Sequence, residues 1–236
     1  MKQIKKIALS KPVEKELSEK QKLINSGKVR PDFNLSGELR KEVRSKLFKA
    51  QKYLCAYCEQ LIDEQNYHIE HFFEQHDFPN RIYDYYHNFL ASCQGDIQPL
   101  TKGETWEEKQ ERLRNISCGH KKTRAYHKNT ELEYQMLLNP HDNINKYISY
   151  TDGYIRPSEI CNQEQKQKVQ YTAKRLNLSS QKLNNRRINA INEILSQMEL
   201  LSDNEVNEYI TDLLDVNQER MPAFHSTLAD NFGFLR

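Results

Sequence analysis

Residues 55–71, CAYCEQLIDEQNYHIEH, bring together the side-chain types that bind metal ions and transfer protons. A Cys-x-x-Cys pair, Cys55 and Cys58, precedes a His-x-Glu-His sequence at residues 68–71. Two thiolates at this spacing are typical of a structural zinc site. An adjacent carboxylate and imidazole can hold a divalent ion and take a proton from water. The segment therefore predicts a structural metal site followed by candidate catalytic residues.

Two further cysteines could complete the metal site. Cys93 and Cys118 lie 25 residues apart rather than in a second Cys-x-x-Cys pair, so ordinary buried thiols are the alternative. We expect a cytoplasmic location, because the chain has no run of about 18 apolar residues and the apolar stretch near its start is too short for a signal peptide. Thiols stay reduced there, which favours zinc over disulfides. Cys161 follows a predicted hairpin and is expected to lie outside the site.

The His-x-Glu-His sequence allows a catalytic and a structural interpretation. On a β-strand, His68 and Glu70 would share one face and His71 would point to the other. Hydrolysis of a phosphodiester needs a general base, a divalent ion at the leaving oxygen and a group that orients the base. His71, Glu70 and the downstream Asn88 offer these groups. The alternative is that His71 is a hydrogen-bonded structural histidine, the more common role of a single histidine.

A predicted helix delivers the chain to the first cysteine. Leu39, Val43 and Leu47 recur at helical spacing after Ser36, which can serve as the N-cap. A short strand should then carry the two histidines, whereas residues 81–93, RIYDYYHNFLASC, could form a helix or a strand that includes a turn.

The remainder of the chain is mainly helical in pattern. Asp152 and Gly153 predict the turn of a hairpin, and residues from 163 onward form helices with a break near residues 177–180. Asp203 can cap a further helix that runs through Leu214, and Pro222 marks another break. These elements indicate an α+β protein that is mostly helical.

Charge is unevenly distributed along the chain, although the net charge is only +2. Residues 1–52 contain 15 Lys and Arg against 6 Asp and Glu, and residues 164–188 contain 7 against 1. Residues 53–163 contain 11 against 17, and residues 189–236 contain 2 against 9. The two basic blocks could contact nucleic-acid phosphates, although solvated helix faces would have the same composition.

Four motifs in this order, CAYC, HIEHF, HNFLASC and CGHKK, resemble the HNH endonuclease family, whose fold is the ββα-metal finger. The chain is more narrowly similar to the PtuB proteins of Septu and retron-associated antiphage systems, through LLNP and YISYTDGYIRP. The resemblance extends over about residues 55–157. It implies a basic N-terminal helical segment (1–52), a zinc-stapled ββα-metal nuclease domain (53–160) and a partner-binding C-terminal helical region (161–236).

The resemblance also implies a role for each motif residue. His71 matches the general base, Glu70 the acidic ligand of a catalytic Mg²⁺ or Mn²⁺, and Asn88 the asparagine that orients the loop of the base. The structural zinc ligands would be the four cysteines, Cys55, Cys58, Cys93 and Cys118.

The chain departs from the family at the second ligand of the catalytic ion. Many zinc-stapled members have a histidine directly after the last cysteine, where this chain has Gly119. His120 is therefore the expected second ligand, with Asp96 as the alternative. His68 is expected to be structural or to support a ligand.

We thus expect a nuclease that cleaves DNA in an antiphage defence system under the control of a PtuA-like ATPase, with a retron RNA and DNA complex as a further, indirect partner and no membrane. The alternative is a zinc module without catalytic activity that binds nucleic acid or protein. The carboxylate beside a histidine favours the enzyme, because a binding module does not need it. Ile191, Ile194, Leu195 and Met198 could either pack in a private core or dock the ATPase.

Overall fold

The protein is a mixed α+β structure, mostly helical, with two small sheets. The computed structural model describes residues 1–96, 103–123 and 131–235. Its helices and strands, in chain order, are α1 (Lys11–Asn25), α2 (Gly37–Ala50), β1 (Tyr67–His71), α3 (Tyr85–Asn88), β2 (Phe89–Cys93), α4 (Trp106–Asn115), α5 (Cys118–Thr123), α6 (Glu131–Met136), β3 (Ile148–Ser149), β4 (Arg156–Pro157), α7 (Gln163–Arg175), α8 (Gln181–Met198), α9 (Asp203–Leu213) and α10 (His225–Phe232). Short 3₁₀ helices are η1 (Pro79–Arg81), η2 (Asn145–Tyr147), η3 (Thr151–Gly153) and η4 (Gly233–Leu235).

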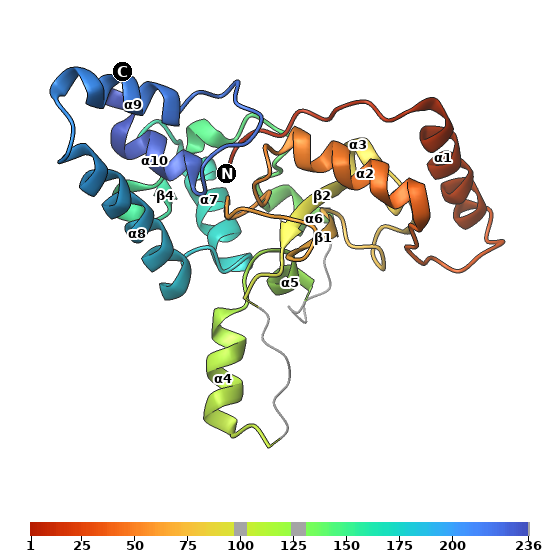
Figure 1. The fold of residues 1–236 in the computed structure, drawn as a ribbon. Coiled ribbons are helices and arrows are strands. Elements are labelled where there is room, and N and C mark those ends of the chain that lie inside the picture. Colours follow the sequence, from red (N-terminus) through yellow and green to blue (C-terminus); the bar gives the residue numbers. More distant parts are fainter. Residues whose placement is uncertain (97–102, 124–130, 236) are drawn as a thin grey trace.

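An antiparallel pair, β1 and β2, forms the centre of the molecule (Figure 1). Its register places His68 opposite Ser92 and Glu70 opposite Leu90. All five residues of β2 are buried, because α2 and α5 pack against this strand. A two-stranded sheet is marginal alone, so these helices supply the apolar surface that it needs.

The predicted helix before the first cysteine is confirmed as α2. Leu39, Val43 and Leu47 are buried on the face that meets the sheet. Its last turn is fixed by Gln51, whose amide nitrogen donates to the Ala91 carbonyl at 2.8 Å and whose amide oxygen accepts from the Ala91 N–H at 2.8 Å. This pairing ties the end of α2 to the backbone of β2.

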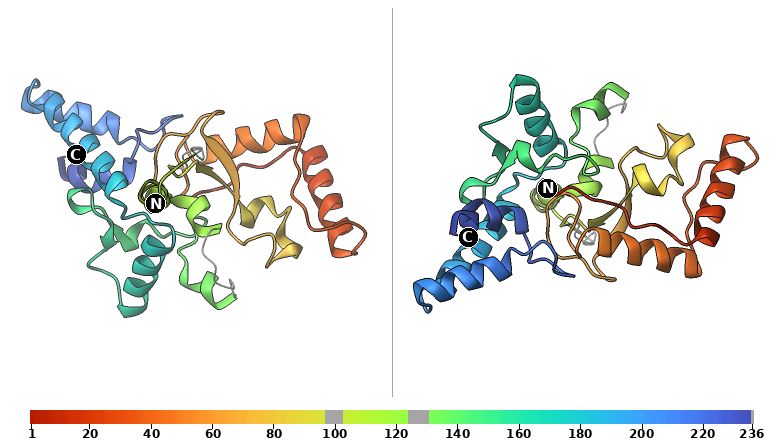
Figure 2. Two further views of the ribbon diagram at one scale, coloured as in Figure 1. Left: turned by 90° about the horizontal axis from the view of Figure 1, so that it is seen from below. Right: turned by 90° about the horizontal axis from the view of Figure 1, so that it is seen from above.

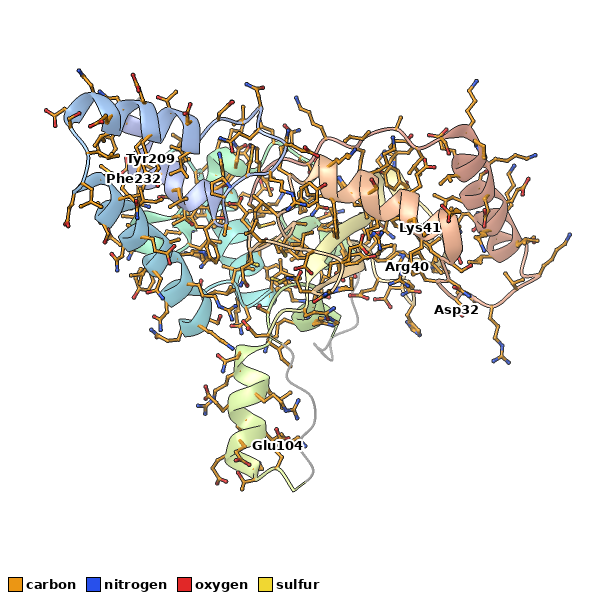
Figure 3. All side chains as sticks on the ribbon, viewed as in Figure 1. Asp32, Arg40, Lys41, Glu104, Tyr209 and Phe232 are labelled. Atoms are coloured by element: carbon orange, nitrogen blue, oxygen red, sulfur yellow. The ribbon has the colours of Figure 1, made fainter. Side chains whose placement is uncertain are left out.

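The chain has one large and one small hydrophobic core. The large core includes residues from Met1 to Leu183, so α7 packs in it together with the sheet. The small core lies among α8, α9 and α10, and its buried members are Ile194, Ile210, Leu214, Leu228 and Phe232. Figure 3 shows Tyr209 and Phe232 within this group of helices.

Helix α1 and the C-terminal helices lie at opposite ends of the molecule, with the sheet between them, in all three views (Figures 1 and 2). Helix α4 extends away from the rest as an arm (Figure 1), and Glu104 lies near its far end (Figure 3). Thr105 begins α4 with a capping box, accepting from the Glu108 N–H at 3.2 Å. The polar composition of this stretch gave no apolar periodicity, so the helix was not predicted.

Several other elements match the sequence-based expectations. Residues 81–93 combine both expected forms, a short helix followed by a strand. The hairpin is formed by β3 and β4, with Asp152 and Gly153 in left-handed conformations between them. The break between α7 and α8 is also confirmed, but Ser202, rather than Asp203, is the N-cap of α9.

Residues far apart in the sequence are joined by backbone hydrogen bonds. The N–H of Ile4 donates to the Pro140 carbonyl at 2.8 Å, and the N–H of Phe224 donates to the Glu59 carbonyl at 2.8 Å. The N-terminal segment therefore packs on the chain that follows α6, and the start of α10 packs on the turn that carries the first cysteine pair. Among the described residues, no helix combines the length and apolar character needed to cross a membrane.

Candidate functional site

The four cysteines form one buried cluster. Their sulfur atoms lie within 4.8 Å of one another. The Sγ atoms of Cys58 and Cys93 are 3.7 Å apart, as are those of Cys93 and Cys118, and those of Cys55 and Cys118 are 3.9 Å apart. A tetrahedron with Zn–S bonds of about 2.3 Å has edges of about 3.8 Å. The cluster can therefore hold a metal ion such as zinc.

The cluster joins three elements of the structure. Cys55 and Cys58 come from the turn after α2, Cys93 ends β2, and Cys118 begins α5. The backbone N–H of Cys93 points at the Cys55 sulfur, at 3.3 Å, which suits a thiolate acceptor. Cys161 lies elsewhere and donates to the Tyr147 carbonyl at 3.2 Å.

Thiol chemistry in the cluster also suits a metal ion. Contacts with the other three thiols, followed by burial, raise the pKa of Cys118. Burial raises the pKa of Cys58. Four thiolates this close would repel one another without a cation, and a coordinating metal ion deprotonates its thiol ligands.

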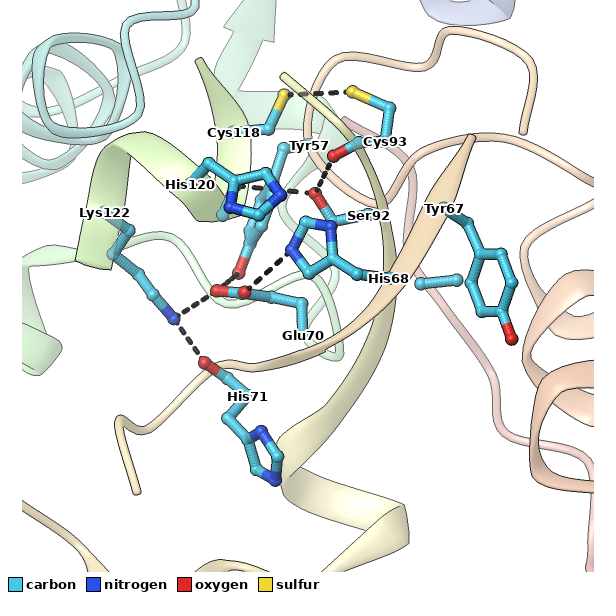
Figure 4. A network of polar contacts seen from close by, with 12 residues as sticks. Tyr57, Tyr67, His68, Glu70, His71, Ser92, Cys93, Cys118, His120 and Lys122 are labelled. Atoms are coloured by element: carbon cyan, nitrogen blue, oxygen red, sulfur yellow. Dashed lines mark hydrogen bonds and ion pairs between the residues drawn. The ribbon is translucent and has the colours of Figure 1, made fainter. Parts of the chain in front are cut away.

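Glu70 lies on β1, and its buried carboxylate belongs to a polar network (Figure 4). Its Oε1 is 2.5 Å from Lys122 Nζ, and its Oε2 is 3.2 Å from His68 Nε2. Burial raises the pKa of Glu70, but the charge of Lys122 and the contact with His68 outweigh burial and lower it to about 2. The carboxylate is therefore ionised at neutral pH.

Lys122 is almost fully buried, and four oxygen atoms surround its ammonium group. Besides Glu70, these are Oε1 of Glu74 at 3.5 Å, the carbonyl of Phe72 at 2.9 Å and the carbonyl of His71. Lys122 belongs to α5, the helix that begins at Cys118. Helix α5 thus connects the cysteine cluster to the end of β1.

His71 ends β1, and its ring points away from Glu70 (Figure 4). Its Nε2 is 2.9 Å from the carbonyl of Ile82. A carbonyl can only accept, so Nε2 carries the proton and Nδ1 has a free lone pair. Burial lowers the pKa of His71 to about 4, although the Ile82 carbonyl opposes this effect. The ring is therefore neutral at physiological pH.

Phe33 covers the ring of His71. The two rings meet edge to face, with centroids 4.4 Å apart. Phe33 belongs to the segment between α1 and α2, and the Tyr83 hydroxyl holds this segment by donating to the Asp32 carbonyl at 3.0 Å and accepting from the Asn34 N–H at 3.0 Å. We call residues 32–34 the Phe33 segment. It leaves His71 only 5% exposed.

Asn88 fastens the loop between the two strands. Its amide nitrogen donates to the carbonyls of Arg81 at 2.7 Å and Phe73 at 3.2 Å, and its amide oxygen accepts from the Phe73 N–H at 2.6 Å. Asn88 thus joins the two ends of the loop that follows His71, and its described contacts are with this loop rather than with the His71 ring.

The two expected second ligands lie in different places. His120 stacks beside His68, with ring centroids 4.1 Å apart, and its Nε2 is 3.1 Å from Gln94 Oε1. The carboxylate of Asp96 is bound by Arg186 at 2.7 Å and Lys182 at 3.2 Å. In the described part of the chain, the four cysteines are the one group of three or more metal-binding side chains close enough to share an ion.

Three residues of the site were not singled out in the sequence: Phe33, Tyr83 and Lys122. Lys122 follows Cys118 closely in the CGHKK motif, but nothing in the sequence indicates its partner Glu70. Phe33 and Tyr83 carry no local signal. No protein-family model matches the chain, and a search of curated proteins finds no significant match.

Proposed function

We propose that this protein is a metal-dependent endonuclease of the HNH type that hydrolyses phosphodiester bonds in DNA. The observation that carries the proposal is the state of His71: a neutral imidazole at the end of β1, with Nε2 bound to Ile82 and Nδ1 able to accept a proton. The order β1, β2, α5 and the thiol cluster around β2 and α5 support an HNH-like core.

The residues of the site would divide the chemistry as follows. His71 takes a proton from the attacking water, and Asn88 keeps the loop that holds Ile82 in place. Glu70 is ionised and would hold a divalent ion such as Mg²⁺ or Mn²⁺. That ion, when bound, stabilises the negative charge on the leaving oxygen.

Cleavage of plasmid DNA in the presence of Mg²⁺ or Mn²⁺ tests the proposal. The wild type should nick or cut the plasmid, and His71→Ala should reduce the rate by about 10²–10⁴, the usual contribution of a general base. His87→Ala is the matched control, because His87 is an exposed histidine of the same loop region. Equal cleavage by wild type and His71→Ala would refute the assignment, provided that both proteins retain zinc.

A zinc module without catalytic activity is the second candidate, and one observation favours it. Both oxygens of Glu70 already have partners, Lys122 and His68, and the residue is 5% exposed. A carboxylate in this state can be a purely structural ion pair. DNA binding without cleavage, at every divalent ion tried, would support this alternative.

The N-terminal basic block is the better candidate for contact with DNA. In residues 164–188, Arg187 is fully buried, Arg186 and Lys182 bind Asp96, and Lys168 pairs with Glu164. Lys166 and Lys174 remain exposed there, and in the N-terminal block the exposed basic residues include Lys28, Arg30 and Arg40. Arg30 and Arg40 lie on either side of the Phe33 segment in the sequence, and this segment covers His71. DNA phosphates bound there would lie beside the proposed base.

The resemblance also supports control by a PtuA-like ATPase in antiphage defence. Ile194 is buried in the small core, with Ile191 and Met198 packed against it, so most of this apolar face is internal. The exposed apolar residues of the C-terminal region include Leu200, at 79% exposure, and Phe234, at 77%.

Substitutions of Leu200 and Phe234 test docking without disturbing the small core. Deletion of the C-terminal residues would remove core members such as Leu228 and Phe232. Leu200→Asp and Phe234→Asp should reduce co-purification with the ATPase while the thermal midpoint stays constant. Leu132→Asp is the control, because Leu132 is 74% exposed on α6. Full co-purification of both variants would place the contact elsewhere.

A further inference from the structure

We infer that His68, rather than His120 or Asp96, is the second protein ligand of the catalytic divalent ion. The inference rests on the proposed function, because it concerns the ion that Glu70 would hold. The imidazole would then come from β1, two residues before Glu70, and not from α5.

The first observation is that the space around Gly119 is already filled by Glu70 and His68. A Cβ atom at position 119 would lie 2.4 Å from Glu70 Oε2 and 2.8 Å from His68 Nε2. Side-chain atoms do not approach so closely, so a histidine at 119 would collide with the ring of His68. The space that a side chain on α5 would need is therefore taken by an imidazole from β1.

The second observation is that the two carboxylate oxygens of Glu70 have different partners. Lys122 binds Oε1 at 2.5 Å, whereas Oε2 faces His68 Nε2 at 3.2 Å. Lys122 thus fixes one oxygen and orients the carboxylate, and the other oxygen shares its surroundings with an imidazole nitrogen. A carboxylate oxygen and an imidazole nitrogen, completed by water, form a donor set that Mn²⁺ and related ions accept.

The third observation is that the His68 side chain is more exposed than that of Glu70. The side chain of His68 is 22% exposed, in contrast to 6% for Glu70, so this side of the pair is the one open to solvent and substrate. Its Nδ1 is shielded from solvent and, among the described residues, has no hydrogen-bond partner. Nε2, the ring nitrogen beside Glu70 Oε2, is therefore the one that would bind the ion.

His120 is placed to support His68 rather than to bind the ion. Its Nε2 already contacts Gln94 Oε1 at 3.1 Å, and its ring stacks on His68. Asp96 is bound to two cations of α8. Neither expected ligand therefore matches the position of His68 at Glu70 Oε2.

An imidazole ligand also predicts metal preference. Nitrogen donors favour Mn²⁺, Co²⁺ and Ni²⁺ over Mg²⁺ more strongly than oxygen donors do. The wild type should therefore bind Mn²⁺ more tightly than Mg²⁺, and His68→Asp should narrow this difference.

The test measures Mn²⁺ binding by calorimetry on zinc-loaded full-length protein, with plasmid cleavage measured in parallel. His68→Ala should weaken Mn²⁺ binding by more than about 100-fold, beyond the roughly 10–100-fold that a residue supporting a ligand typically contributes, whereas His120→Ala should stay within that range. Gly119→Ala should also weaken Mn²⁺ binding, because its Cβ would lie 2.4 Å from Glu70 Oε2 and 2.8 Å from His68 Nε2 and would push both groups from their places.

Wild-type affinity in His68→Ala, or an equal loss in His120→Ala, would overturn the inference. If His68→Ala does not fold, pulsed electron paramagnetic resonance on Mn²⁺-loaded His120→Ala decides: the nitrogen coupling of a bound imidazole must persist, and its loss assigns the ligand to His120. Mn²⁺ binding that depends on His68 without any DNA cleavage would refute the nuclease but retain the ligand. Absence of Mn²⁺ binding to the wild type would refute the ligand.

Discussion

At the scale of single residues, Lys122 decides how the site is held. Its ammonium group lies among two carboxylates and two carbonyls at the end of β1. Four oxygens around one cation resemble the arrangement that proteins use for hard metal ions. In this protein the Lys122 ammonium group provides the positive charge, and it positions Glu70 and the backbone of His71.

Lys122→Met should destabilise the protein by about 3–5 kcal/mol, because it leaves the Glu70 carboxylate buried without its partner. Urea unfolding measures the change. Lys121→Met is the matched control on the same helix, and it should change the free energy of unfolding by less than about 1 kcal/mol. Equal effects of the two substitutions would show that the buried ion pair contributes nothing specific.

His141 predicts a pH dependence of stability. Burial, followed by Lys6 and His87, lowers its pKa from 6.5 to about 3. Below pH 6.5 the unfolded chain takes up a proton that the folded chain refuses until about pH 3, so the free energy of unfolding falls over this range as the pH falls. At pH 5 this single group should account for a loss of about 2 kcal/mol relative to neutral pH.

Urea unfolding at pH 7.5 and 5 checks this prediction. His141→Gln should remove about 2 kcal/mol of the acid-induced loss. His76→Gln, whose side chain is 99% exposed in the wild type, should leave the loss unchanged. The same pH dependence in all three proteins would contradict the assignment.

At the scale of elements, the cysteine cluster fixes β2 and α5 relative to the turn before β1. We expect about one tightly bound zinc ion per chain, and Cys55→Ser should lose it, because a tetrahedral site needs all four ligands. Metal analysis by mass spectrometry measures the zinc content. Removal of the ion should also weaken the folded state, since structural zinc contributes directly to folding.

Cys161→Ser is the control, since Cys161 is buried and its thiol donates to the Tyr147 carbonyl, away from the cluster. It should retain the full zinc content. Full zinc in Cys55→Ser, or loss of zinc in Cys161→Ser, would contradict the four-cysteine site.

The Phe33 segment should restrict access to His71. Tyr83→Phe removes the hydroxyl that binds Asp32 and Asn34, so the segment should open more often and His71 should react faster with diethyl pyrocarbonate. We expect a severalfold increase in the rate of His71 modification, since a hydrogen bond contributes about 0.5–1.5 kcal/mol. Peptide mapping measures modification at His71.

Tyr86→Phe is the matched control, because the Tyr86 hydroxyl contacts Glu14 of α1 instead of this segment. It should leave the rate of His71 modification unchanged. Unchanged reactivity in Tyr83→Phe as well would mean that the Phe33 segment does not limit access.

At the scale of the whole molecule, the sequence predicted the local elements better than their contacts. Apolar spacing revealed α2, α7 and α8, and Cys-x-x-Cys spacing indicated half of the cysteine cluster. The pairing of Lys122 with Glu70, or of Tyr83 with the Phe33 segment, joins side chains from different elements. Such contacts leave no periodic trace in one sequence, so reasoning from local patterns could not find them.

The same limit explains the sites where local reasoning gave an incomplete answer. Asp96 stands near Cys93 in the sequence and was a reasonable ligand, but α8 brings Arg186 and Lys182 onto it. The basic block at residues 164–188 predicted a surface for phosphates, yet Arg187 is buried against Tyr150 and Phe224. Only the three-dimensional arrangement determines which charges remain available.

The contact between Glu59 and Ser226 has a consequence for synthesis of the chain. Glu59 follows the Cys-x-x-Cys pair directly, and its carboxylate accepts from the N–H and hydroxyl of Ser226, which is made 167 residues later. At a translation rate of about 5–20 residues per second, a ribosome needs roughly 10–30 s to cover that distance. During this interval the first cysteine pair is outside the ribosome with Glu59 still lacking this partner. A newly made chain would therefore complete this contact beside the cysteine cluster only after residue 226 has been synthesised.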